Sequence, residues 1–224
     1  MPYRVVVINP NSTQAVTDAI SLSVDVHRQG DCQVDCLTLP EGPPGIVTQT
    51  HKAAIVAPMQ AVIAREQDDA DAFVIACYGD PGLQAAREST ARPVFGIGEI
   101  SFYAAMAMGD QFGIISTDAR ACMRHFRYAR ELGVAQRMAG DLSIEIPILQ
   151  LEKDRDETLR RSVEIGRQLQ ASGARSLILG CAGLAPFRMA LQEQLGIAII
   201  EPAMTTVGWA CAAVRSGLAR TPAC

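Results

Sequence analysis

The chain has 224 residues, of which 49% are hydrophobic and 20% are charged, and its formal net charge is −4. A chain of this size and hydrophobicity buries a substantial core, and its mildly acidic balance gives no electrostatic footprint for nucleic acid. The apolar stretches are too short or too interrupted for a bilayer-spanning helix, and the first residues lack the apolar region of a signal peptide. We therefore expect a soluble, cytoplasmic protein with neither nucleic acid nor membrane as a partner.

Apolar β-branched runs that end in Gly, Asn, Ser or Cys alternate with segments of helical period, which is typical of an α/β protein with a parallel sheet. In chain order, the expected strands are residues 5–8, 32–39, 73–76, 93–96, 112–115, 176–179 and 197–200. The expected helices are residues 13–26, 48–66, 83–87, 119–132, 157–170, 186–195 and 203–218.

The two halves of the sequence resemble each other. Residues 74–79, VIACYG, resemble residues 178–183, ILGCAG, and the cysteines Cys77 and Cys181 lie 104 positions apart. The strand at 93–96 has a counterpart at 197–200 with the same offset. Such a repeat implies two α/β halves related by an approximate two-fold axis. We expect one domain at 1–97 plus 205–224 and a second at 98–204.

Cys77 and Cys181 each follow a strand, at the edge where open parallel sheets bind their ligands. A cysteine close to a helix N-terminus can have its thiol pKa lowered from about 8.5, so that it serves as thiolate base or thiol acid. Two such cysteines on opposite sides of one carbon suit a 1,1-proton transfer, because inversion requires proton removal from one face and delivery to the other. This pattern predicts a racemase.

The intermediate of such a transfer carries negative charge on a carbonyl oxygen, so oriented donors must stabilise it. Polar side chains at the remaining strand ends are suitable donors. They are Asn9, Asn11 and Ser12 after the first strand, and Ser116 and Thr117 after its counterpart. The same residue types cap helix N-termini, so substrate contact and capping both stay open for them.

Three motifs resemble the hydantoin racemase branch of the aspartate/glutamate racemase superfamily. They are Ile8-Asn9-Pro10-Asn11-Ser12-Thr13, Ala76-Cys77-Tyr78-Gly79-Asp80-Pro81-Gly82-Leu83, and Leu179-Gly180-Cys181-Ala182-Gly183. The resemblance implies two pseudo-symmetric flavodoxin-like (Rossmann-like) domains with an active site between them, Cys77 and Cys181 as the acid/base pair, and no metal or organic cofactor. The residues expected to bind the substrate are Asn9, Ser12, Tyr78, Gly79, Ser116, Thr117, Ala182 and Gly183.

The expected substrate is a small carbonyl compound, in first place a 5-substituted hydantoin or a related cyclic ureide such as allantoin. Neither cysteine has a Lys or Arg beside it in sequence, which favours an uncharged ring over an amino-acid carboxylate, although Arg87 and Arg92 could reach the site. An aspartate- or glutamate-type racemase, a maleate cis-trans isomerase and an arylmalonate decarboxylase are the alternatives. A non-catalytic ligand-binding protein is the alternative from another class.

The remaining titratable residues have structural interpretations. The seven cysteines are an odd number and are scattered, so we expect free thiols rather than a disulfide framework. The cysteines assigned to packing are Cys32, Cys36, Cys122, Cys211 and Cys224. The three histidines, His27, His51 and His125, show no metal-binding spacing and are assigned to surface or helix packing.

The apolar C-terminal helix with Trp209 leaves room for an interface, so we expect a homo-oligomer.

Overall fold

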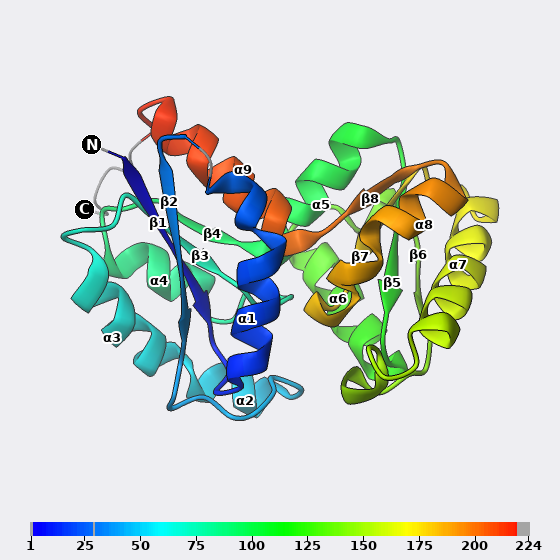
Figure 1. Ribbon diagram of the computed structural model, residues 1–224, viewed down its shortest axis with the longest axis horizontal. Coiled ribbons are helices and arrows are strands. Elements are labelled where there is room, and N and C mark those ends of the chain that lie inside the picture. Colours follow the sequence, from blue (N-terminus) through cyan, green and yellow to red (C-terminus); the bar gives the residue numbers. More distant parts are fainter. Residues whose placement is uncertain (1, 29, 219–224) are drawn as a thin grey trace. The chain divides into compact units, whose positions relative to one another are not determined.

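The computed structural model describes residues 2–28 and 30–218. Within them the chain forms two compact units, the first containing the residues up to Ile100 and from Ala203 onward, and the second Ser101–Pro202. Each unit holds a four-stranded parallel sheet (Figure 1). The predicted α/β class with parallel sheets is confirmed. The domain limits 1–97 plus 205–224 and 98–204 stay a proposal about the folding units.

The first unit is built on a sheet in the order β2-β1-β3-β4. Its strands are β1 (Tyr3–Asn9), β2 (Cys32–Thr38), β3 (Ala72–Ile75) and β4 (Val94–Gly96). Its helices are α1 (Gln14–Ser23), η1 (Asp25–His27), α2 (Gln49–Ala54), α3 (Val56–Glu66) and α4 (Leu83–Ser89). The central strands contain continuous apolar runs, residues 5–8 of β1 and all of β3, because helices cover both of their faces.

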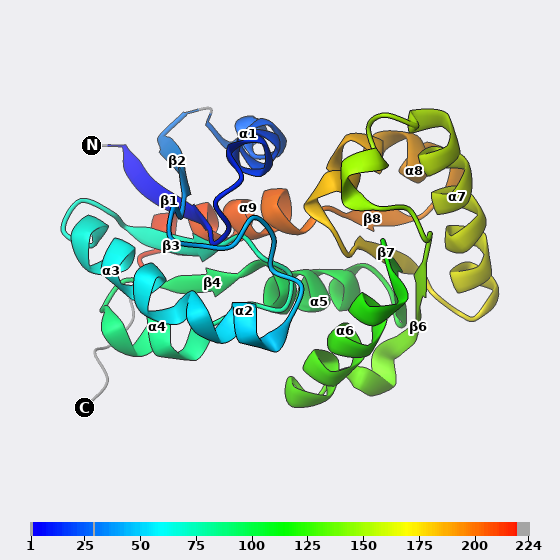
Figure 2. The same ribbon diagram turned by 90° about the horizontal axis from the view of Figure 1, so that it is seen from below.

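Figure 2 shows α3 and α4 on one side of this sheet and α1 on the other. On the α3 side, Ile8, Met59, Ile63, Phe73 and Ile75 belong to one buried cluster that joins the strands to the helices. This packing fixes the strands in register, so that their carboxyl ends lie at one edge of the sheet.

The C-terminal helix α9 (Pro202–Arg215) is attached to the first unit by contacts close to the start of β2. His27 Nε2 lies 2.8 Å from the carbonyl oxygen of Met204, and Cys32 is bonded to Cys211 in a disulfide. The prediction of free thiols is therefore wrong for these two cysteines. They are 179 residues apart, so only the return of the chain to the first sheet brings them together.

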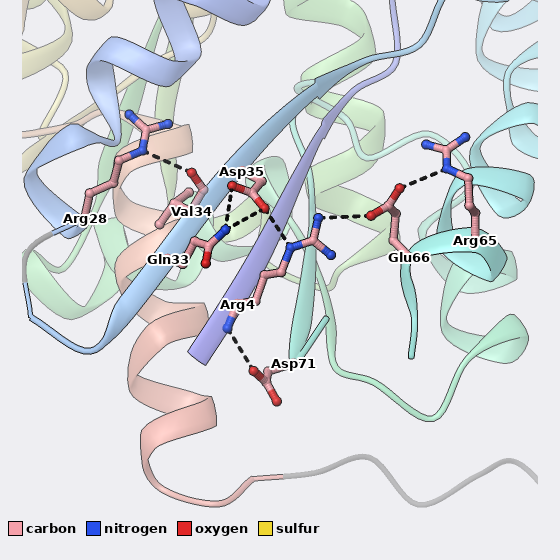
Figure 3. A network of polar contacts seen from close by, with 8 residues as sticks. All are labelled: Arg4, Arg28, Gln33, Val34, Asp35, Arg65, Glu66 and Asp71. Atoms are coloured by element: carbon pink, nitrogen blue, oxygen red, sulfur yellow. Dashed lines mark hydrogen bonds and ion pairs between the residues drawn. The ribbon is translucent and has the colours of Figure 1, made fainter. Parts of the chain in front are cut away.

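Arg4 organises the amino-terminal edge of the first sheet (Figure 3). Its guanidinium donates to Asp35 at 2.6 Å and to Glu66 at 3.0 Å, and its backbone N–H donates to Asp71 at 2.8 Å. These bonds join β1 to β2, to the end of α3 and to the start of β3. The charges are thus gathered at one edge of the sheet, and Cys77 follows β3 at the opposite, carboxyl edge.

The second unit repeats the arrangement with the strand order β6-β5-β7-β8. Its strands are β5 (Phe112–Ser116), β6 (Met138–Ser143), β7 (Ser176–Leu179) and β8 (Ala198–Ile200). Its helices are α6 (Ala119–Glu131), η2 (Ala135–Arg137), η3 (Ile148–Gln150), α7 (Arg155–Ala171), η4 (Ala182–Phe187) and α8 (Arg188–Leu195). Figure 2 shows α7 and α8 on one side of this sheet and α6 on the other.

Three segments differ from the prediction. A helix, α5 (Ile97–Met108), follows β4 directly, and the edge strand β6 pairs with β5; neither was predicted. The helix expected over 48–66 is divided at Ile55 into α2 and α3. Among the described helices, none combines the length and apolar character needed to cross a bilayer. Cys224 lies outside the described residues.

Candidate active site

Cys77 lies on a tight turn at the carboxyl edge of the first sheet. Ala76 extends β3 by donating its N–H to the carbonyl of Ile8 at 2.9 Å, and Asp80 donates its N–H to the carbonyl of Cys77 at 3.0 Å. The turn requires left-handed backbone at Gly79, where φ is +91°, which glycine adopts without steric cost. The thiol is therefore half-buried at the strand end, as the sequence predicts.

Asn9 ends β1 at the same edge, and its side chain is used within the unit. Its Nδ2 donates to Thr17 Oγ1 at 2.9 Å and to Asn11 Oδ1 at 3.1 Å, while its Oδ1 accepts from the Asn11 N–H at 3.2 Å. Asn9 is 1% exposed. These bonds tie the end of β1 to Asn11 and to Thr17 of α1, but they do not cap the helix, because Asn9 accepts no N–H of α1 in them and the N-cap residue is Thr13. Ser12 is half-buried, and its N–H donates to the carbonyl of Pro43.

A cation that the sequence did not place at the site reaches the Cys77 turn from α2. Lys52 Nζ donates to the carbonyl of Gly79 at 3.1 Å, and a Cβ at position 79 would lie 2.5 Å from that nitrogen. The two cations that the sequence left open point elsewhere, since Arg87 pairs with Glu99 and Arg92 donates to the Gln67 carbonyl. Lys52 is 25 residues from Cys77, so its position at the Cys77 turn could not be predicted from its distance along the sequence.

Cys181 lies on an equivalent turn in the second unit. Gly180 extends β7 by donating its N–H to the carbonyl of Ile115 at 2.9 Å, and Leu184 donates its N–H to the carbonyl of Cys181 at 3.0 Å. Cys181 then stands at the N-cap position of η4. The same two backbone bonds therefore present both cysteines at the carboxyl edges of their own sheets.

The environment of Cys181 acts on its thiol in opposite directions. Burial raises the pKa of Cys181; the backbone of Gly183 lowers it, the charge of Asp118 raises it, and the hydroxyl of Thr117 lowers it. The net pKa of this thiol is raised, so the predicted lowering by the helix N-terminus is wrong for Cys181. Desolvation of the thiolate outweighs the two hydrogen bonds to it. The hydroxyl of Thr117 and the backbone of Gly183 lie at this sulfur, and their role in substrate binding stays a prediction.

Ser116, at the end of β5, belongs to a buried polar cluster with α6 and β6. Its hydroxyl donates to Asp141 Oδ1 and lies 3.2 Å from His125 Nδ1, which lies 2.8 Å from Asp141 Oδ2. Cys122 faces the same cluster, and burial followed by the Asp141 charge raises its pKa to about 12. Ser116 thus holds the strand end from within the unit, and His125 is buried rather than at the surface.

The other predicted binding residues line the two turns. Tyr78 and Gly79 follow Cys77, and Ala182 and Gly183 follow Cys181; all four are half-buried. Among residues 2–28 and 30–218, no cluster of three His, Cys, Asp or Glu side chains has the geometry of a metal site. Each turn presents a thiol with flanking backbone N–H groups, and the hydroxyl of Thr117 lies beside Cys181.

The fold and the turns define a class of protein: an α/β enzyme with two related parallel sheets, each presenting a cysteine at its carboxyl edge. The sequence profile of the Asp/Glu/Hydantoin racemase family matches residues 5–210. The chain belongs to this family, and it is an isomerase of the racemase type.

Individual relatives agree with this assignment. A hydantoin racemase of Pseudomonas sp. (strain NS671) is 31% identical over 209 residues, which cover 92% of this chain and 84% of the relative. A hydantoin racemase of Paenarthrobacter aurescens is 30% identical over 205 residues, covering 89% of this chain and 86% of the relative. The structure of an allantoin racemase from Klebsiella pneumoniae matches with a TM-score of 0.91 at 28% identity, covering 98% of this chain and 90% of that chain.

Proposed function

We propose that this chain is a cofactor-independent racemase of 5-substituted hydantoins or of a related cyclic ureide such as allantoin, with Cys77 and Cys181 as its two acid/base residues. The observation that carries the proposal is the equivalence of the two cysteine turns, which share a strand-extending bond and a turn-closing bond at the same offsets. The names of the curated relatives and of the solved allantoin racemase support the substrate class.

In the proposed reaction one thiolate removes the proton from the stereogenic carbon next to the substrate carbonyl, and the electron pair moves onto the carbonyl oxygen. The second cysteine, present as thiol, delivers its proton to the opposite face of that carbon and becomes thiolate. After turnover the first cysteine is a thiol and the second is a thiolate. This is the state that converts the product enantiomer back to the substrate enantiomer. This proposal requires both sulfur atoms to reach one carbon from opposite faces.

The developing oxyanion needs donors that are already oriented. We assign this role to the backbone N–H groups of Tyr78, Gly79 and Ala182 and to the hydroxyl of Thr117. Asn9 and Ser116 act in this proposal by holding their strand ends, because their side chains are buried and bonded within their own units.

The test is to incubate one pure enantiomer with the enzyme in deuterated water, over a panel of 5-substituted hydantoins, allantoin, aspartate and glutamate, against an enzyme-free control. We expect inversion accompanied by solvent deuterium at the stereocentre for a hydantoin or allantoin. If no member of the panel shows either change, the proposed function is wrong.

The roles of the two cysteines are tested by Cys77→Ala and Cys181→Ala, with Cys36→Ala as the matched control. Cys36 is also a free, half-buried thiol, but it lies within β2. We expect inversion to fall at least about a thousandfold in each site variant, because a two-base transfer cannot be completed with one thiol. The control should keep its activity. Full turnover by either site variant would contradict the assigned roles. If the wild type binds the ligand without turnover, the chain is better described as a non-catalytic binding protein.

A second candidate is an aspartate- or glutamate-type racemase, and Lys52 is the observation that favours it. The ammonium group of Lys52 lies at the Cys77 turn, where a substrate carboxylate could pair with it. Under this candidate, Lys52→Met should raise KM for the amino acid much more than it changes any hydantoin turnover, because loss of the bond to the Gly79 carbonyl affects both reactions but loss of the carboxylate partner affects only one. Absence of exchange with both amino acids in the wild type would remove this candidate.

A further inference from the structure

The carboxylate of Asp80 connects the Cys77 turn to the first turn of α5. Its two oxygens accept the backbone N–H groups of Gly98 at 2.8 Å and Glu99 at 2.6 Å. Asp80 is 6% exposed, so these charge-assisted bonds lie away from water. The N-terminal N–H groups of a helix have no partner within the helix, and a carboxylate there also interacts favourably with the helix dipole.

The same residue closes the cysteine turn through its backbone. The Asp80 N–H donates to the carbonyl of Cys77, and the Asp80 carbonyl accepts from the N–H of Leu83. Asp80 has φ +44°, a left-handed conformation that is unfavourable for a residue with a side chain. A single residue thus binds the backbone on both sides of the turn and the helix that follows β4. The turn cannot shift without breaking these bonds.

Comparison with the second unit shows that the turn itself does not require a carboxylate. At the position equivalent to Asp80, the second unit has Leu184, which is fully buried in an apolar cluster and closes its turn with the same backbone bond. The acidic side chain is therefore present only at the Cys77 turn, so its role depends on its contacts within the first unit.

Two residues next to the Asp80 carboxylate, Gly96 and Glu99, make room for it and bind it. Gly96, the last residue of β4, faces it so closely that a Cβ at position 96 would overlap with the carboxyl group. Glu99, which donates its N–H to Asp80, also holds Arg87 of α4 in a salt bridge. The carboxylate is therefore enclosed by the end of β4 and the start of α5, and the Glu99–Arg87 salt bridge ties α4 to this start.

We propose that Asp80 is a positioning residue for Cys77: by binding the first turn of α5 it fixes the Cys77–Asp80 turn and thereby the place of the thiol. The inference deepens the proposed function and rests on it for its consequence in catalysis. A displacement of reacting atoms by about 1 Å can cost a hundredfold in rate, so Asp80 substitutions should reduce turnover even in protein that stays folded.

The test uses two variants of Asp80 and one matched control. Asp80→Asn keeps the shape but turns an N–H donor toward a backbone N–H, while Asp80→Gly removes the carboxyl group and takes the positive φ without strain. Asp71→Asn is the control, because Asp71 also accepts a backbone N–H, that of Arg4, but at the opposite edge of the same sheet. Each protein is measured for thermal unfolding, for racemisation, and for alkylation of Cys77 relative to Cys181 by iodoacetamide with peptide mass spectrometry.

We expect both Asp80 variants to change the Cys77-to-Cys181 labelling ratio at least about tenfold and to reduce inversion about a hundredfold, while Asp71→Asn lowers only the unfolding temperature. A labelling ratio within twofold of the wild type in either folded Asp80 variant would overturn the inference, as would an equal loss of inversion in the control. The labelling needs no substrate. If the wild type racemises nothing, the proposed function fails, yet the ratio still decides whether Asp80 positions the thiol.

Discussion

Gly96 offers a direct test of how tightly the Asp80 carboxylate is enclosed. A Cβ at this position would lie 2.6 Å from Asp80 Oδ1 and closer still to the rest of the carboxyl group. The carboxyl can relieve this overlap only by moving away from the N–H groups of Gly98 and Glu99, which it now accepts. Gly96→Ala should therefore perturb the same bonds as a substitution of Asp80, without altering that residue.

The magnitude of the destabilisation follows from two costs of the substitution, the overpacking and the loss of an acceptor for a buried N–H group. Overpacking a filled interior costs about 1–3 kcal/mol, and leaving a buried backbone donor without its acceptor costs about 1–3 kcal/mol. We expect Gly96→Ala to lower the free energy of unfolding by about 2 kcal/mol. For a chain of 224 residues this corresponds to a fall in Tm of roughly 4–8 °C.

The assay is urea unfolding of a double-mutant cycle, with Gly45→Ala as the control. A Cβ at Gly45 meets no atom within 4 Å, so the control should leave stability unchanged or slightly raised. In an Asp80→Gly background the carboxyl group is gone, and Gly96→Ala should then cost less than about 0.5 kcal/mol. An equal cost of Gly96→Ala in both backgrounds would show that the enclosure of the carboxylate has been misjudged.

Two further predictions concern charge. Hydrogen bonds from Arg65 and Arg4 hold the pKa of Glu66 below its ordinary value, so its stabilising contribution is present above that value and is lost as pH falls through the depressed one. Arg4→Met should lower the free energy of unfolding by about 1–2 kcal/mol at pH 7 and by much less at an acidic pH below the depressed pKa of Glu66. Urea unfolding at both pH values measures this difference, and an equal loss at both would contradict the assignment. Asp118→Asn should lower the pKa of Cys181, because the Asp118 charge contributes to raising it, while an Asn still caps α6. The pH dependence of Cys181 alkylation reports this pKa, and a midpoint that stays in place or moves upward would refute the electrostatic argument.

The parts of the site that sequence could predict are those encoded by neighbouring residues. Cys77 and Cys181 each end an apolar run and precede a glycine-containing turn, and the structure has both cysteines at strand ends as expected. The strands themselves were predictable because central parallel strands must be apolar on both faces. Local pattern and tertiary structure agree wherever a segment's own residues supply its stabilisation.

The parts that sequence could not predict depend on partners far along the chain. Helix α5 begins immediately after β4, and Asp80 accepts N–H groups of its first turn from 18 and 19 positions away. Lys52 reaches the Cys77 turn from α2, and His125 is drawn into the interior by Asp141 on β6, a strand whose half-buried residues show no clear alternation. In each case the decisive contact is a hydrogen bond between elements that only the folded sheet brings together.

The two thiols therefore share a backbone frame but have different surroundings, and this difference constrains the kinetics of the proposed reaction. The Cys181 pKa is raised by burial, whereas the Cys77 turn carries Lys52 and the enclosed Asp80 carboxylate. Because two enantiomers have equal free energy, kcat/KM must be equal in the two directions at every pH, however unlike the two bases are. The asymmetry can appear only in kcat and KM taken separately. In Asp80 and Asp118 variants the ratio of the two kcat values should therefore equal the ratio of the two KM values, and any change in kcat/KM should be the same in both directions.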